Sequence, residues 1–184
     1  EPLENALKKL PFVCEVGVSE GFPGQATETN TFDREGNEIK VGMILCDSTA
    51  FRLYNFKRAS AKNHPIVNSI WMPQQTYSTL VSQAGFIEKD PLFAGEETIT
   101  FGGIVEDYAV LDALRDSEGY LTYIQIQDAK NFSPWMSNGA GLLIKTTGEH
   151  GDNKKKIDEE YRKYVESVEG RYTEPAYSGY IKDL

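Results

Sequence analysis

The sequence predicts a strand-rich α+β protein in which a curved antiparallel sheet or small barrel is followed by a C-terminal amphipathic helix. Three observations predict it: short segments alternate apolar and polar residues, Gly102 and Gly103 interrupt one of these segments, and residues 152–169 carry apolar side chains at helical spacing. A pair of glycines lets a strand bend sharply or bulge. We expect one domain over 1–184, with a possible subdivision into a strand and helix lobe (1–90) and a barrel lobe (97–184).

The elements of the first half are marked by three signals. Apolar residues recur at helical spacing before Pro11 and after Pro73, and Pro11 ends the first helix because proline cannot continue it. Apolar and polar residues alternate after Pro11, with Cys14 on the apolar face, and turn-forming residues separate the later strands. These signals predict, in chain order, a helix over 2–10, a strand over 12–18, a hairpin of strands over 27–32 and 39–46, strands over 51–56 and 66–72, and a helix over 74–84.

The second half contains the glycine-bent strand and the clearest helix. Residues 108–114 fit either a helical turn or an extension of the bent strand, and the sequence leaves the two open. The apolar stripe of the last helix ends at Gly170, a residue typical of helix C-termini. The predicted elements are a strand over 98–105, strands over 120–127 and 141–146, and a helix over 152–169.

A bent strand, two further strands and then a helix follow one another between residues 97 and 184. This order resembles the one that opens an OB-type barrel, in which a helix lies between the third and fourth strands. The resemblance concerns the order of elements alone. It implies a small closed barrel in the C-terminal half.

Charge and hydropathy limit the partners of the chain. Its 28 acidic and 19 basic residues give a formal charge of −9, which disfavours nucleic acid as a partner without forbidding it. No apolar run reaches the roughly 18 residues that a bilayer crossing needs, so we expect no membrane insertion. The chain begins at Glu1, which fits either removal of a leader or trimming, and on this ground we lean towards an extracytoplasmic location. Cys14 and Cys46 could form a disulfide or remain free thiols.

One segment matches a catalytic pattern. The stretch Gly17-Val18-Ser19-Glu20-Gly21 has the spacing of a nucleophile elbow, which would make a small serine hydrolase an alternative function. That motif requires a helix directly after the serine, whereas Phe22-Pro23-Gly24 indicates a loop, so an ordinary turn serine is favoured. The cysteines and histidines lack zinc-site spacing, and no phosphate-binding motif is present. We therefore expect no metal and no cofactor, and we lean against an enzyme.

A second alternative is a single-stranded nucleic-acid-binding protein of the OB-like kind. Basic and aromatic residues interleave at Arg52, Tyr54, Phe56 and Arg58, as they do in grooves where bases stack on aromatic rings. An ordinary strand with both faces covered explains the same pattern and is favoured. Residues 154–156, three lysines at the expected start of the last helix, oppose the helix dipole and suggest an anionic partner or a frayed first turn.

Aromatic residues in loops lead to the preferred hypothesis. Trp135 lies in a polar loop, with Tyr120 and Tyr123 nearby in the sequence. Tryptophan and tyrosine provide a large contact area at a small entropic cost, which makes them frequent in recognition surfaces. The sequence therefore favours a non-catalytic binding or assembly domain that recognises a protein or carbohydrate partner through Trp135, Tyr120 and Tyr123.

Overall fold

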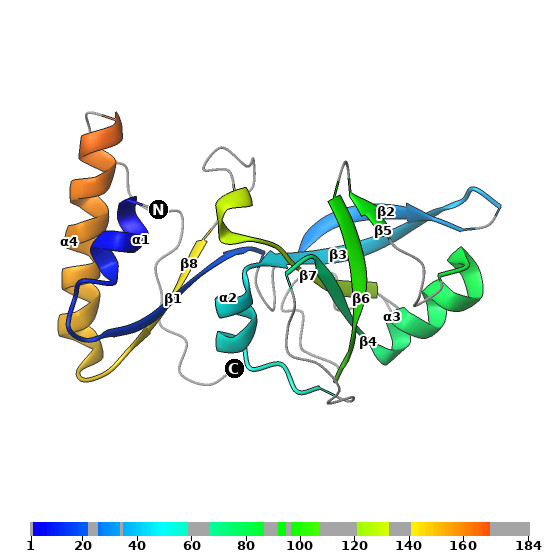
Figure 1. Cartoon of the computed structure of the whole chain (residues 1–184), viewed down its shortest axis with the longest axis horizontal. Helices are drawn as coiled ribbons and strands as arrows, with labels where there is room; N and C mark the ends of the chain where they lie inside the picture. Colours follow the sequence, from blue (N-terminus) through cyan, green and yellow to red (C-terminus); the bar gives the residue numbers. More distant parts are fainter. Residues whose placement is uncertain are drawn as a thin grey trace. The chain divides into compact units, whose positions relative to one another are not determined.

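The computed structural model is an α+β fold that combines helices with a mixed sheet (Figure 1). It describes residues 2–21, 26–33, 35–58, 67–86, 92–94, 97–106, 121–132 and 141–169. The helices are α1 (Pro2–Leu7), α2 (Ser48–Leu53), α3 (Gln74–Thr79), the π-helical turn η1 (Leu80–Ala84), the 3-10 turn η3 (Ala129–Asn131) and α4 (His150–Glu169). The strands are β1 (Val13–Glu20), β2 (Thr27–Phe32), β3 (Glu38–Cys46), β4 (Ser69–Pro73), β5 (Leu92–Ala94), β6 (Glu97–Val105), β7 (Leu121–Ile126) and β8 (Gly141–Thr146).

The sheet has eight strands in the order β5-β6-β4-β7-β3-β1-β8, with β2 paired to β3 beside this path. It is mixed, because β3 pairs with β7 and β4 with β6 in parallel, while β1–β3, β2–β3, β4–β7 and β5–β6 are antiparallel. The order does not close on itself. The prediction of an α+β fold with a C-terminal helix is confirmed, whereas that of a purely antiparallel sheet or closed barrel is wrong.

The strands of the C-terminal half do not form an OB-like lobe. In the sheet, β4 separates β6 from β7, and β3 and β1 separate β7 from β8. An OB-type barrel would need these three strands to be neighbours. Strands from the first half of the chain fill the intervening places, so the described strands β6, β7 and β8 do not form a sheet of their own.

The chain divides into two compact units: unit 1 comprises Glu1–Val16 and Leu143–Leu184, and unit 2 comprises Gly17–Leu142. One domain over 1–184, with a possible subdivision into 1–90 and 97–184, stays a prediction. In unit 1, α1 packs against α4. The Lys145 ammonium lies 3.3 Å from a carboxylate oxygen of Glu15, and the ammonium of Lys156 lies 5.5 Å from the ring centre of Phe12.

The helix α4 begins earlier than its apolar pattern indicated. Because its first residue is His150, the lysines at 154–156 lie in the second turn rather than at the N-terminus. The predicted conflict with the helix dipole therefore does not arise, since that effect is confined to the first turn. Lys154 forms an ion pair with Asp158, one turn further on, at 2.6 Å.

In unit 2 one face of the sheet is fully buried around Trp71. Trp71 lies opposite Ile124 on the neighbouring strand, and its ring centre is 5.4 Å from that of Phe51 in α2. Its indole nitrogen donates to the hydroxyl of Ser69 at 3.1 Å. A Cβ atom at Gly102 or Gly103 would overlap this indole, and the β4–β6 register shifts between Ile70 and Trp71. The predicted glycine bulge is confirmed, and its cause is the tryptophan.

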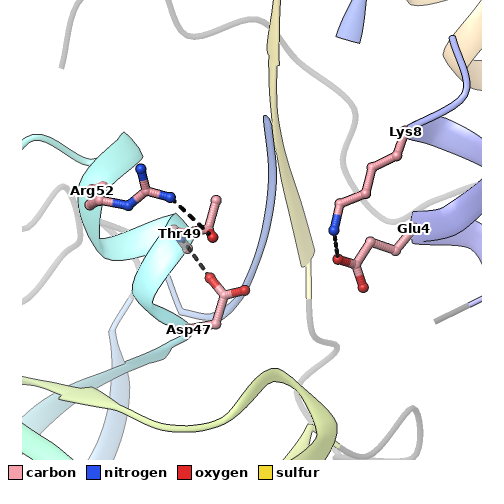
Figure 2. A network of polar contacts seen from close by, with 6 residues as sticks. Glu4, Lys8, Asp47, Thr49 and Arg52 are labelled. Atoms are coloured by element: carbon pink, nitrogen blue, oxygen red, sulfur yellow. Dashed lines mark hydrogen bonds and ion pairs between the residues drawn. The ribbon is translucent and has the colours of Figure 1, made fainter. Parts of the chain in front are cut away.

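The prediction of a strand over 51–56 is wrong, because α2 covers the first half of this segment and a turn follows it. Asp47 caps the helix: its carboxylate accepts from the Ala50 amide at 2.6 Å (Figure 2). Gly17 on β1 lies against Ala50, where a Cβ atom would collide with the Ala50 backbone. A capping aspartate and a matching glycine on the strand beneath thus outweigh the β-propensity of the aromatic residues.

The other predicted elements agree with the structure, apart from residues 108–114, which lie outside the described part. Cys14 and Cys46 are free thiols; Cys46 is buried, whereas Cys14 is exposed although alternation had placed it on the apolar face. No helix in the described ranges is both long and apolar enough to cross a bilayer. The confirmed elements are α1, β1, the β2–β3 hairpin, β4, α3 with η1, β6, β7, β8 and α4.

Candidate protein-interaction surface

The sheet face of unit 2 opposite Trp71 carries a partly exposed group of aromatic rings, which we call the aromatic surface and define as Tyr77, Phe86, Phe101 and Tyr123. These rings pack on a buried layer of Ile70, Met72 and Ile99. The ring centres of Tyr77 and Phe101, and those of Phe86 and Phe101, are each 5.5 Å apart. The rings are therefore held in fixed positions while keeping part of their surface exposed.

The local sequence after β4 explains how two of these rings meet. Pro73 precedes α3, and the chain continues through the wider turn η1 until Gly85, whose φ of 70° ends the helix in the left-handed region. The Phe86 amide then donates to the Leu80 carbonyl at 3.1 Å, and the Phe86 ring meets that of Tyr77 edge-on at 6.1 Å. Helical π-turns are rare and frequently occur at functional sites.

Tyr123 belongs to this surface and lies on β7, within the strand that the sequence predicted over 120–127. Its hydroxyl donates to the Met43 sulfur at 3.2 Å, and burial raises the pKa of its phenol above the ordinary value. Tyr123 is therefore neutral at physiological pH and half-buried. The other two predicted recognition residues, Trp135 and Tyr120, lie outside the described residues, and their role stays a prediction.

A hollow of about 380 Å³ lies on the other side of α3. Its lining comes from β3, from the start of β7 and from one side of α3 and η1, namely Ile39, Lys40, Gln75, Thr79, Gln83 and Leu121. The helix is fixed beside it by Thr76, whose buried hydroxyl accepts from the Thr122 amide at 3.0 Å. The hollow is thus lined mostly by polar side chains, with Ile39 and Leu121 as its two apolar residues.

The basic and aromatic residues at 52–58 do not form a stacking platform. Tyr54 is 3% exposed, and its hydroxyl lies 3.3 Å from the Gly21 carbonyl. The Phe56 ring packs on those of Tyr54 and Phe51, at 5.4 and 5.6 Å. Arg52 and Arg58 are exposed, Arg52 on α2 beside Thr49 (Figure 2) and Arg58 in a bridge to Val105. Because Tyr54 has no exposed ring face, bases cannot stack on it.

Ser19 is a buried structural residue and not a nucleophile. It lies within β1 with 0% exposure, and its hydroxyl is 2.8 Å from the Gly21 carbonyl and 3.3 Å from that of Leu45. A nucleophile elbow requires an exposed serine at a strand-to-helix turn. Nor do the described residues include a group of three or more His, Cys, Asp or Glu side chains placed to hold a metal ion.

Comparison with known proteins identifies a fold and no family. No protein-family model matches the sequence, and no curated protein matches it either. The fold is similar to the extracellular domain of the noncanonic ABC-type transporter YknZ from Gram-positive bacteria, with a TM-score of 0.59 and 12% identity over 94% of this chain and 84% of that one.

Two further solved structures have the same fold. The periplasmic region of MacB from Actinobacillus actinomycetemcomitans gives a TM-score of 0.57 at 9% identity, over 92% of this chain and 73% of that chain. A domain of a putative permease protein from Porphyromonas gingivalis gives a TM-score of 0.54 at 8% identity, over 89% of this chain and 70% of that chain. These three neighbours are thus the extracellular domain of an ABC-type transporter, a periplasmic region and a domain of a putative permease.

Proposed function

We propose that this chain is the extracytoplasmic domain of an ABC-type transporter, and that it contacts a protein partner and carries out no reaction itself. The observation that carries the proposal is the fold: its similarity to the YknZ extracellular domain extends over 94% of this chain and 84% of that one. The periplasmic region of MacB has the same fold at similar coverage.

The aromatic surface supports contact with a protein. Half-exposed rings on a rigid sheet provide apolar area at a small entropic cost, as the centres of protein interfaces do. Tyr77, Phe101 and Tyr123 come from α3, β6 and β7, so the sheet fixes their relative positions. Trp135 and Tyr120 are proposed as further contacts of the same partner.

The location is tested with the cysteines of the chain. Cys14 is exposed and Cys46 is buried, and burial raises the pKa of the Cys46 thiol far above its ordinary value, so only Cys14 should react. A membrane-impermeant maleimide added to intact spheroplasts should label the wild type and leave Cys14→Ser unlabelled. Ser82→Cys in the Cys14→Ser background provides a second exposed reporter. Labelling of both reporters only after detergent treatment would place the domain in the cytoplasm and refute the proposal.

The partner is tested by photo-crosslinking in cells. Phe86→benzoylphenylalanine places a reactive ring on the aromatic surface, and the same substitution at Glu35, an exposed residue in the β2–β3 turn, is the control. We expect a discrete adduct with a second protein from position 86 and none from position 35. The absence of an adduct from position 86, or equal adducts from both positions, would contradict a protein-contact role for this surface.

A further inference from the structure

The solvent side of α3 and η1 is an exposed helix surface without a charged residue. We call it the outer face of α3 and define it as Gln74, Ser78, Val81 and Ser82, which recur at helical spacing and are all exposed. No Asp, Glu, Lys or Arg occurs between residues 63 and 87, although 26% of the chain is charged. The solvent face of a helix usually includes charged residues, whereas the centres of protein interfaces are depleted of them. The outer face therefore has the composition of a protein contact.

Val81 provides the apolar part of this face, and the polar residues beside it are already ordered. Val81 is 37% exposed and is one of three large apolar residues that are exposed in the described part of the chain. The Gln74 amide donates to the Ser78 hydroxyl at 3.1 Å, and the Ser82 hydroxyl donates to the Ser78 carbonyl at 2.9 Å. Because these bonds restrain the polar side chains in the free protein, a partner that contacts them loses little affinity to ordering them.

The hydrogen-bonding chemistry of the outer face favours a second copy of the same chain. In a two-fold interface, a residue near the axis meets its own copy. A charged side chain there would face an equal charge and be repelled, whatever its sign. Amides and hydroxyls both donate and accept, so they can bond to copies of themselves. A different protein would be recognised most readily through the acidic side chains of a chain that carries a charge of −9, and this face has none.

We propose that the outer faces of α3 from two copies of this chain pack against each other about a two-fold axis near Val81. The inference rests on the proposed function, because the second copy is then the protein partner of the domain. The two Val81 side chains meet at the axis, and Gln74, Ser78 and Ser82 surround them. Tyr77, which lies on the same helix, joins the outer face to the aromatic surface.

The size of this contact predicts a weak dimer. Residues 74–84 form about 16 Å of helix. One helix of this length and the rings beside it provide less than the roughly 800 Å² per partner that stable interfaces bury. We therefore expect the two copies to exchange between monomer and dimer. Position 82 then stays open to the maleimide that tests the location of the domain.

The experiment places a charge of either sign at the axis. Sedimentation equilibrium of the purified chain, from about 10 µM to about 1 mM, should show the mass rising from 20.6 kDa towards twice that value. Val81→Glu and Val81→Lys should each weaken the dimer at least tenfold, because each variant brings two like charges together. An equal mixture of the two variants should recover the dimer, because the introduced charges are then opposite. Recovery would also show that both variants are folded.

The matched control is Val67→Glu. Val67 is 42% exposed and precedes β4, whereas α3 follows the other end of that strand, so this variant should form the dimer as the wild type does. The inference is overturned if the wild type stays monomeric up to about 1 mM, or if Val67→Glu weakens the dimer as much as Val81→Glu. It is also overturned if only one sign of charge at position 81 weakens the dimer, or if the mixture does not recover it, because either result excludes a two-fold contact at Val81.

Photo-crosslinking from position 86 separates this inference from the proposed function. An adduct of twice the mass of the chain supports both. An adduct with a different protein, together with a monomeric chain, would refute the second copy as partner and leave the proposed function in place. A dimer that depends on position 81 without any adduct from position 86 would support this inference and count against the proposed role of the aromatic surface.

Discussion

The bend in β6 depends on Gly102 and Gly103, which have no side chains and so leave room for the indole of Trp71. A Cβ atom at Gly102 would overlap the indole of Trp71, which is 1% exposed and anchored to Ser69. Because this ring can move only by disturbing its neighbours, we expect Gly102→Ala to lower the free energy of unfolding by about 2 to 3 kcal/mol. Urea denaturation followed by tryptophan fluorescence measures the change.

The control for this substitution is Gly151→Ala, in the first turn of α4. A Cβ atom there meets no heavy atom within 4 Å, and alanine favours helices more than glycine does. Stability should stay the same or rise by up to about 1 kcal/mol. If Gly102→Ala were as stable as Gly151→Ala, the close contact between the glycine and the indole would not exist in solution.

The sequence predicted least well which single residues are exposed to solvent. Tyr54 and Tyr123 were both candidates for binding, yet Tyr54 is buried under the helix α2 that it caps, and Tyr123 keeps part of its ring exposed. Cys14 was expected on the apolar face of β1 and is exposed. Local alternation indicates that a strand has two different faces, but it does not say how far other elements cover either face.

At the scale of elements, the start of α2 depends on its cap. The Asp47 carboxylate accepts from the Ala50 amide at 2.6 Å in a buried position (Figure 2). Removing it in Asp47→Ala leaves that amide without its partner, so we expect a loss of about 1 to 2 kcal/mol in urea denaturation. Asp47→Asn, which keeps an acceptor oxygen, should recover most of this loss. Equal losses in both variants would show that the charge of Asp47 matters and the cap does not.

The elements that the sequence predicted correctly have a local signal. The β2–β3 hairpin follows from a turn between two strands, and α4 follows from an apolar stripe along one side of the helix. The segment after Asp47 was assigned to a strand because its aromatic residues favour strands, while the capping signal of Asp47 was interpreted as a turn. The parallel pairing of β3 with β7 joins Val41 to Leu121, and no local pattern encodes such a distant partner.

At the scale of the whole molecule, the candidate surface is a product of the topology. Tyr77, Phe101 and Tyr123 are brought together because β4 lies between β6 and β7 and α3 packs on all three strands. The sequence identified the helix that carries Tyr77 and the strands that carry the other two residues. It could not place them together, because the OB-like order assigned β6 and β7 to adjacent positions and left β4 out.

Two buried acidic groups, with a lesser part for the half-buried Tyr123, make the stability of the fold depend on alkaline pH. Burial raises the pKa of the Cys46 thiol and of the Tyr54 phenol far above their ordinary values, and the nearby Asp47 carboxylate raises both further. The folded chain therefore keeps both groups neutral. The unfolded chain ionises them at their ordinary pKa, about 8.5 for cysteine and about 10 for tyrosine.

It follows that the stability these groups contribute is fully present below about pH 8.5 and is lost as the pH rises. We expect the free energy of unfolding to fall by up to about 1.4 kcal/mol per pH unit above that point through Cys46, and more steeply above pH 10 or so through Tyr54. Urea titrations from neutral to alkaline pH give the slope. Cys46→Ala should reduce the slope between about pH 8.5 and pH 10, and Tyr54→Phe should reduce the slope above about pH 10. The control Cys14→Ser removes an exposed thiol and should keep the wild-type slope. A wild-type slope in Cys46→Ala would mean that the thiol ionises in the folded protein, which its complete burial opposes.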